Sequence, residues 1–264
     1  MLRSVFAKSL YDQRRSLIGW ALGLVVMILI VMAAYPAVRD NPAIGQVLEE
    51  LPQAIVVLIG DLDIVSAAGY LNSRLFTMIL PLMFLIYGIG RGAQAIAGEE
   101  ERKTLDLLLA YPLDRKRVVA EKFLALCTLL VALGMVAWLA QLVGVALVDM
   151  PISAGRLAGA TFNAVLLGLL FGALALALGC ATGRRGLSVG VSTALGIAGF
   201  FIHGLAPLVE QLEFAQKLSP FYYYIGNDPL RNGLDPLHVG VLSGTTFMLL
   251  LLALISFSRR DVAV

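Results

Sequence analysis

The sequence predicts an all-α polytopic membrane protein, and its composition and the spacing of its apolar runs support that prediction. Hydrophobic residues make up 59% of the 264 residues and charged residues only 14%, whereas soluble domains average about half and about a quarter. The apolar residues gather in six runs that are long enough to cross a bilayer. We therefore expect residues 1–264 to form a single transmembrane domain with no separate soluble domain.

The first predicted element, residues 1–16, is a basic amphipathic helix. Arg3, Lys8, Arg14 and Arg15 alternate with apolar side chains there, a pattern typical of helices that lie on an anionic membrane surface. The apolar run that follows is longer than the core of a cleaved signal peptide, and further runs come after it, so we interpret it as the first span. The predicted spans occupy residues 17–35, 75–97, 123–148, 161–182, 187–209 and 239–257.

Two loops on the far side of the membrane contain predicted helices of their own. In the first loop, Ile44, Val47, Leu48 and Leu51 recur at helical spacing, which predicts a short interfacial helix. The external segment at residues 210–238 has prolines and consecutive tyrosines, which argue against a single span. Tyrosines are enriched at the boundary between water and lipid, so we expect short interfacial or re-entrant helices there.

The distribution of Lys and Arg predicts the orientation. If both termini are cytoplasmic, 15 of the 20 basic residues lie inside and only Arg39, Arg74, Arg156, Lys217 and Arg231 lie outside. The opposite orientation would invert that ratio and violate the positive-inside rule. We therefore expect a multi-pass protein of the cell membrane with both termini in the cytoplasm.

The densest group of charges follows the second span, and we expect residues 98–113 to form a cytoplasmic helix. Its first turn holds three acids, Glu99 to Glu101, which suit the positive end of a helix dipole. Leu105, Leu108 and Leu109 share one face, and Pro112 ends the helix. This leucine face requires a partner, either lipid headgroups or another protein.

This segment resembles the inner loop of the permease subunit of ABC transporters of the type-2 exporter class. The resemblance rests on four motifs: Gly98-Glu99-Glu100, Thr104-Leu105, Leu107-Leu108-Leu109 and Tyr111-Pro112-Leu113. The six-span layout and the basic N-terminus agree with it, as does the Leu218-Ser219-Pro220-Phe221-Tyr222 segment. Lys103 and Asp106 depart from the family, which often has Gly and Glu there. Both keep a helix possible, and Lys103 favours a helix more than Gly does.

The resemblance implies that residues 98–113 are a coupling helix that docks on a separate ATPase subunit. The expected docking residues are Glu99, Glu100, Glu101, Arg102, Thr104, Leu105, Leu108, Leu109 and Pro112. It further implies a homodimer, or a heterodimer with another permease, bound to two ATPase subunits that hold ATP and Mg²⁺. We expect no nucleic-acid partner.

The sequence offers no catalytic motif of its own. A P-loop requires G-x-x-x-x-G-K-[ST], and the stretch that ends at Lys103-Thr104 has Ala97 and Arg102 at the two glycine positions. The G-x-S-x-G pattern at residues 186–190 opens a membrane helix, where small residues are common. We therefore expect no enzyme activity, no metal site and no cofactor in this chain.

Polar residues within the spans are few, which argues against an ion-coupled transporter. Gln141, Asn163 and His203 are the main ones. They could line a substrate path, although hydrogen bonds that fix helix packing are their usual role. Pairs of glycines four residues apart allow helices to approach closely. These pairs are Gly19 and Gly23, Gly88 and Gly92, Gly168 and Gly172, Gly179 and Gly183, and Gly186 and Gly190.

These observations together favour the permease of an ATP-driven exporter with a hydrophobic or amphipathic substrate. Two alternatives stay open at this level. One is an ion-coupled or passive transporter that works without an ATPase. The other is a regulatory membrane protein that has kept the coupling helix but transports nothing.

Overall fold

A computed structural model describes residues 4–40, 66–104, 114–208 and 213–260 of the chain. Two predictions fall largely outside these residues. The interfacial helix expected around residues 44–51 lies wholly outside them. Of the predicted coupling helix, residues 105–113 lie outside them, including Leu105, Leu108, Leu109 and Pro112.

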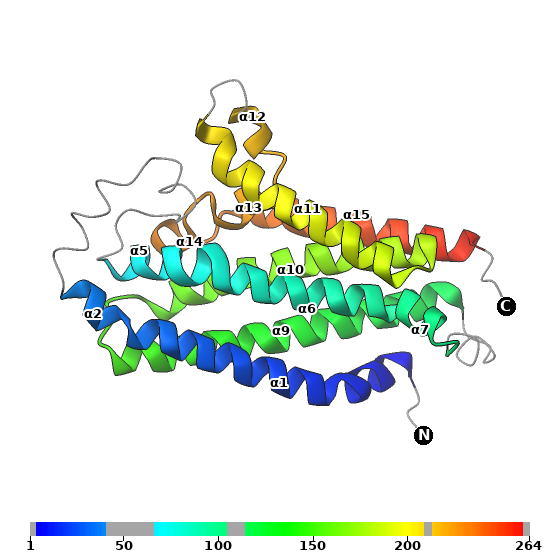
Figure 1. Ribbon diagram of the computed structural model, residues 1–264, viewed down its shortest axis with the longest axis horizontal. Coiled ribbons are helices and arrows are strands. Elements are labelled where there is room, and N and C mark those ends of the chain that lie inside the picture. Colours follow the sequence, from blue (N-terminus) through cyan, green and yellow to red (C-terminus); the bar gives the residue numbers. More distant parts are fainter. Residues whose placement is uncertain (1–3, 41–65, 105–113, 209–212, 261–264) are drawn as a thin grey trace.

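Six long helices run side by side along the molecule (Figure 1). All six are long and apolar enough to cross a membrane, and the described residues contain no strand. The predicted fold class, a polytopic all-α membrane protein with six spans, is therefore confirmed. The second span is the helical stretch Ala67–Ala95, which ends in α6 (Leu80–Ala95). The others are built on α1 (Val5–Ala33), α9 (Arg115–Leu147), α10 (Ala154–Thr182), α11 (Arg185–Leu205) and α15 (Pro236–Arg259).

The first helix joins two elements that the sequence separates. Residues expected as a surface helix and residues expected as the first span form one continuous helix, α1, and the short helix α2 (Tyr35–Arg39) follows it. The Ser4 side chain caps α1 by accepting a hydrogen bond from the backbone N–H of Ala7. Because no proline or glycine interrupts residues 5–18, the chain has no local reason to break between the basic stretch and the apolar one.

The second span begins earlier than residue 75 and changes its helical pitch. It starts with α5 (Ala67–Leu71), continues as a π-helix, η1 (Asn72–Ile79), and ends as α6. Pro81 lies just after the π-helix, and a proline lacks an N–H and crowds the carbonyl four residues before it. The wider π turn accommodates that defect. The Tyr224 hydroxyl donates a hydrogen bond to the Phe76 carbonyl oxygen at 2.7 Å, within this stretch.

The helix α10 lies at the centre of the bundle and contacts α6, α9, α11 and α15. Its closest neighbour is α6, where two of the predicted glycine pairs face each other. A Cβ atom added at Gly88 would collide with the carbonyl oxygen of Gly168, and one added at Gly92 would collide with that of Gly172. Only glycine allows the two backbones to approach this closely.

Short helices occupy the segment before the last span, residues 213–232, which the sequence predicts to be external. They are α12 (Glu213–Gln216), α13 (Pro220–Ile225) and α14 (Pro229–Asn232). Ser219 fixes α13 from both sides, because its hydroxyl accepts from the N–H of Phe221 and donates to the carbonyl of Gly199 on α11 at 2.7 Å. The rings of Tyr222 and Tyr223 pack against His238 at the start of α15. This cluster of rings joins the segment to the last span.

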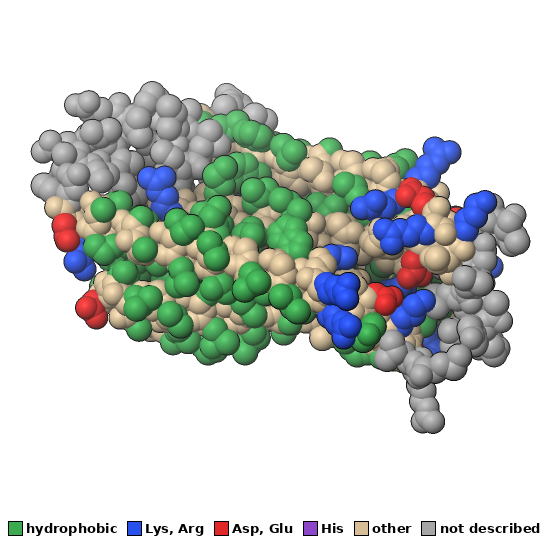
Figure 2. Space-filling model, turned by 60° about the horizontal axis from the view of Figure 1, so that its bottom comes forward, with side chains coloured by type: hydrophobic (Ala, Val, Ile, Leu, Met, Phe, Trp, Pro, Cys, Tyr) green, Lys and Arg blue, Asp and Glu red, His purple; other side chains and the backbone are tan. Residues whose placement is uncertain are grey.

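The two ends of the bundle differ in charge. The chain enters α1 and leaves α15 at the same end of the molecule (Figure 1). Lys, Arg, Asp and Glu side chains gather at that end, whereas hydrophobic side chains cover the middle of the visible face (Figure 2). A hydrophobic belt beside a charged end is the surface expected of a protein embedded in a bilayer.

Candidate functional site

The candidate site is built around α7 (Ala97–Glu101), a short helix at the charged end of the bundle. It follows a break at Ile96, where α6 has ended. Ala97 and Gly98 are buried against the bundle. A Cβ atom at Gly179, the α10 residue next to this point, would lie 3.4 Å from the Cβ atom of Ala97. These small residues therefore allow α7 to pack directly against α10.

Lys103 ends α7, and this corrects the sequence prediction that Lys103 favours continuation of the helix. Its φ angle is +57°, a left-handed conformation that glycine adopts most readily. The N–H of Lys103 donates to the Glu100 carbonyl, and the N–H of Thr104 donates to the Glu99 carbonyl, both at 2.9 Å. These two bonds make a Schellman cap. The capping hydrogen bonds outweigh the higher helix propensity of Lys relative to Gly. The left-handed conformation also explains why the family often has glycine at this position.

The three acids of α7 each contact a different membrane helix or its end. Glu99 forms an ion pair with Lys122 on α9. Glu100 forms an ion pair with Arg260, which directly follows α15. The carboxylate of Glu101 accepts a hydrogen bond from the backbone N–H of Arg185, the first residue of α11, at 3.0 Å. The positive end of the α11 dipole also stabilises a carboxylate at that position.

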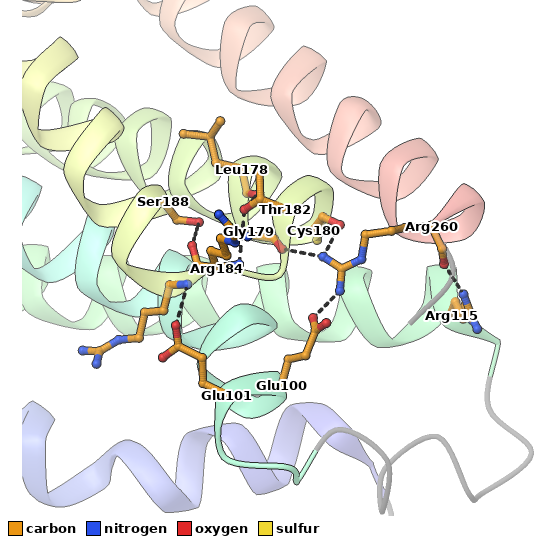
Figure 3. Close-up of polar contacts among 11 residues, drawn as sticks. Glu100, Glu101, Arg115, Leu178, Gly179, Cys180, Thr182, Arg184, Ser188 and Arg260 are labelled. Atoms are coloured by element: carbon orange, nitrogen blue, oxygen red, sulfur yellow. Dashed lines mark hydrogen bonds and ion pairs between the residues drawn. The ribbon is translucent and has the colours of Figure 1, made fainter. Parts of the chain in front are cut away.

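Arg260 connects four segments at one point. Its guanidinium contacts Glu100 and also donates to the carbonyl oxygens of Gly179 at 3.3 Å and Cys180 at 3.2 Å, near the end of α10. Arg115, the first residue of α9, donates to the Arg260 carbonyl at 2.7 Å (Figure 3). The Gly179 carbonyl also accepts from the backbone N–H of Gly183, so Arg260 is a second donor there. It also supplies a donor to the Cys180 carbonyl near the helix end, while it neutralises Glu100.

A second set of contacts fixes the start of α1 against α9. Glu121 accepts a hydrogen bond from the backbone N–H of Phe6 at 3.0 Å and pairs with Arg117 at 2.8 Å. Lys122, the next residue, has only 8% of its side chain exposed. A cation this deeply buried requires a nearby carboxylate, and Glu99 supplies it. The charged end of the bundle is therefore a connected network rather than a set of solvated side chains.

The structure describes five of the predicted docking residues. Glu99, Glu100 and Glu101 bind partners within the chain, whereas Arg102 and Thr104 are exposed. The partners Lys122, Arg185 and Arg260 were absent from the predicted site. Their signal was present in the sequence, because all three lie at the ends of spans on the side where the orientation argument places the acids. Pairing between the two groups follows once both are assigned to one face.

The three polar residues expected within the spans have separate partners. Gln141 on α9 donates to the Thr161 hydroxyl on α10 at 3.0 Å. Asn163 on α10 donates to the Tyr224 carbonyl at 3.1 Å, and the His203 carbonyl on α11 accepts from Gln216 at 3.2 Å. Each bond joins two helices, which is the packing role that such residues commonly have. The contacts bring none of the three residues together.

Comparisons with known proteins agree with this architecture. The family described as "ABC-2 family transporter protein" matches residues 3–262. A similar sequence in Pseudomonas aeruginosa is named "Probable ABC transporter permease protein NosY"; it is 38% identical over 136 residues. That match covers 49% of this chain and 46% of the relative, so the alignment spans about half of either protein.

Proposed function

Because the chain belongs to the ABC-2 transporter family, we propose that it is the membrane permease of an ATP-driven exporter. In this proposal a separate ATPase subunit binds ATP and Mg²⁺ and hydrolyses the nucleotide. The permease provides the path across the bilayer. The contacts of α7, the placement of charge and the glycine faces of two outer helices each support part of this assignment.

The observation that carries the proposal is the set of contacts made by α7. Its three consecutive acids reach α9, α11 and the junction of α10 with the end of α15. A partner that moves residues 102–113 would therefore displace several spans at once, because only Ile96 separates α7 from α6 and the acids of α7 contact the other spans directly. Packed helices respond to such a push by moving between discrete arrangements. This is the mechanical property that a coupling element requires.

Charge placement supports docking at this end of the molecule. By the positive-inside rule the network lies in the cytoplasm, where ATP is available. Arg102, Lys103 and Thr104 are exposed beyond α7, and the leucine-rich residues 105–113 follow directly. An apolar centre with a charged rim is the composition of a protein interface. We assign residues 102–113 as the surface that contacts the ATPase, and Glu99 to Glu101 as residues that transmit its movement.

Two copies of the permease and two ATPase subunits complete the proposed assembly. On α1 and α11, a Cβ atom added at Gly19, Gly23, Gly186 or Gly190 would have no described atom of this chain within 4 Å beyond its own helix backbone. Glycine faces allow close approach of a second helix, so we assign these faces to the contact with the second permease, whether identical or not. The path through the bundle would be lined by apolar residues, which suits a hydrophobic or amphipathic substrate.

The test is co-expression with the ATPase subunits encoded in the same genome, followed by purification through a tag on the permease. The wild-type permease is expected to co-purify with one of the candidate ATPases. Leu105→Asp/Leu108→Asp is expected to lose that ATPase while still inserting in the membrane. Ser258→Asp/Arg259→Asp is the matched control. It adds two acids at an exposed site at the end of α15 and should retain the ATPase.

The alternatives predict other outcomes. If no ATPase binds the wild-type chain, the coupling assignment fails and a passive or ion-coupled transporter becomes the better explanation. If an ATPase binds but reconstituted vesicles move no substrate from a panel of amphipathic compounds, a regulatory role is favoured. ATP-dependent transport that Leu105→Asp/Leu108→Asp abolishes would support the proposal in full.

A further inference from the structure

A cavity of about 570 Å³ opens at the charged end of the bundle. The first turns of α1 form one wall, and the end of α6 with α7 forms the opposite wall. Lys122 of α9 and Arg185 of α11 complete the lining. Glu99, Arg102 and Thr104 of the predicted docking residues also line it, but most of the lining comes from α1, α6, α9 and α11, so the cavity extends well beyond residues 102–113.

The lining of this cavity is strongly basic. It contains two acids, Asp12 and Glu99, and five basic residues, which are Lys8, Arg91, Arg102, Lys122 and Arg185. Glu99 is already paired with Lys122, and Arg91 donates to the Ser16 hydroxyl. The side chains of Lys8 and Arg185 take part in no ion pair or hydrogen bond within the described residues. The cavity therefore holds positive charge that the described chain does not neutralise.

A buried polar atom without a well-aligned partner also lies on the cavity wall. Tyr87 is only 2% exposed, and its hydroxyl lies near Arg91 but forms no hydrogen bond of good geometry with the described residues. The Arg91 guanidinium lies over the same ring, 5.3 Å from its centre. A buried hydroxyl without a well-aligned partner is unfavourable. A bound group with acceptor oxygens would satisfy Tyr87 and Arg91 together.

The apolar rim of the cavity continues onto the lipid-facing surface. Trp20 of α1 and Ile86 of α6 line it above the basic residues. The Ile86 side chain is 51% exposed, on a helix that spans the bilayer. A ligand in the cavity can thus place a charged group among the cations and an alkyl chain along the surface of α6.

From these observations we propose that the cavity binds the phosphate headgroup of an anionic phospholipid. The phosphate lies among Lys8, Arg91 and Arg185 and accepts a hydrogen bond from Tyr87, and the acyl chains lie along Trp20 and Ile86. A phosphodiester supplies the negative charge and the acceptor oxygens that the lining lacks. Free phosphate could satisfy the cations, but it would leave most of 570 Å³ unfilled and the apolar rim unused.

The test measures lipid retained by the purified full-length chain, without any ATPase. The protein in detergent is incubated with equal amounts of phosphatidylglycerol and phosphatidylcholine that carry the same acyl chains. Bound lipid is then counted by native mass spectrometry. Wild type is expected to retain phosphatidylglycerol in preference. Lys8→Gln/Arg185→Gln is expected to lower its affinity roughly tenfold, since each surface cation contributes a severalfold effect.

Two further variants separate a specific site from general charge. Arg15→Gln/Lys116→Gln removes two exposed cations at the same end that do not line the cavity, and it should bind lipid like wild type. Lys8→Arg/Arg185→Lys keeps the charge and should retain binding. Because all of the substituted side chains are exposed, each variant should fold, and a thermal unfolding curve checks that it does.

Three results would overturn the proposal. Equal retention of the two lipids by wild type would exclude recognition of the headgroup charge. If Lys8→Gln/Arg185→Gln and the control variant lost equal affinity for phosphatidylglycerol, net charge alone would explain the binding. Displacement of phosphatidylglycerol by millimolar inorganic phosphate would identify the occupant as a free anion. None of these results bears on whether an ATPase docks, so the proposed function is tested separately.

Discussion

Glu100 and Arg260 form an ion pair across 160 residues of sequence. The pair joins α7 to the chain directly after the last span, and Arg260 extends the connection to the last turn of α10. Gly183 at the turn after α10 has a φ angle of +68°, and a side chain there would press on both partners. The close packing of this turn leaves the two charges partly buried, with 18% and 22% of their side chains exposed.

Arg260→Ala is expected to destabilise the protein more than Glu100→Gln. The alanine removes the ion pair and also removes the Arg260 donor from the Cys180 carbonyl and one of two donors from the Gly179 carbonyl, for a total of about 2–4 kcal/mol. Glu100→Gln can keep a hydrogen bond and should cost about 1–2 kcal/mol. Unfolding of the purified proteins in detergent measures the difference. Arg259→Ala is the control, because Arg259 is exposed; equal losses in the two arginine variants would contradict the assignment.

The Glu99–Lys122 pair leads to a prediction about a buried charge. Glu99→Gln leaves Lys122, 8% exposed, without a counter-charge, and should cost about 2–4 kcal/mol. Glu99→Gln/Lys122→Gln removes both charges and should be more stable than the single variant. Arg117→Gln, which breaks a pair whose arginine is 64% exposed, should change the free energy of unfolding by less than about 1 kcal/mol. A double variant less stable than the single one would show that the pair is not buried in solution.

The sequence was sufficient to predict the number and approximate positions of the spans, because hydropathy over about 20 residues depends on the bilayer and not on tertiary detail. It also located the acids of α7. The partners of those acids required three-dimensional information, since Lys122, Arg185 and Arg260 come from three different helices or their ends. Their common side of the membrane could be inferred, but their individual pairing could not.

Local conformations were harder to predict than spans. The left-handed Lys103 contradicts its helix propensity, because the capping bonds of residues 99–104 outweigh a propensity difference of under about 1 kcal/mol. The π-helix at Asn72–Ile79 had a signal in Pro81, but a proline can equally kink or end a helix. The neighbours of a segment decide between these outcomes, and here Tyr224 reaches the Phe76 carbonyl.

Tyr224→Phe should therefore weaken the protein around the π-helix. The hydroxyl is buried and donates to the Phe76 carbonyl at 2.7 Å, so its removal leaves that carbonyl without this donor at a cost of about 1–2 kcal/mol. Hydrogen–deuterium exchange should rise in residues 72–79 more than in the remaining spans. Tyr223→Phe is the matched control, because that hydroxyl forms no hydrogen bond with the described residues. Similar effects of the two variants would argue against a role for this bond.

The close glycine contact between α6 and α10 leads to a prediction about the free energy of unfolding. A methyl group at Gly88 or Gly92 meets a backbone carbonyl of Gly168 or Gly172, and a backbone cannot move aside as a flexible side chain can. Gly88→Ala and Gly92→Ala should each force the helices apart and cost about 1–3 kcal/mol. Gly90, on the same helix, has no such atom within 4 Å of an added methyl group.

Gly90→Ala is thus the matched control for the two contact variants. Alanine is favoured over glycine inside a helix by up to about 1 kcal/mol, so this change should leave the unfolding midpoint unchanged or raise it. The three variants make the same chemical substitution on one helix and differ only in what the methyl group meets. If all three variants raise the midpoint, helix propensity governs this segment and the close approach of α6 to α10 is not a determinant of stability.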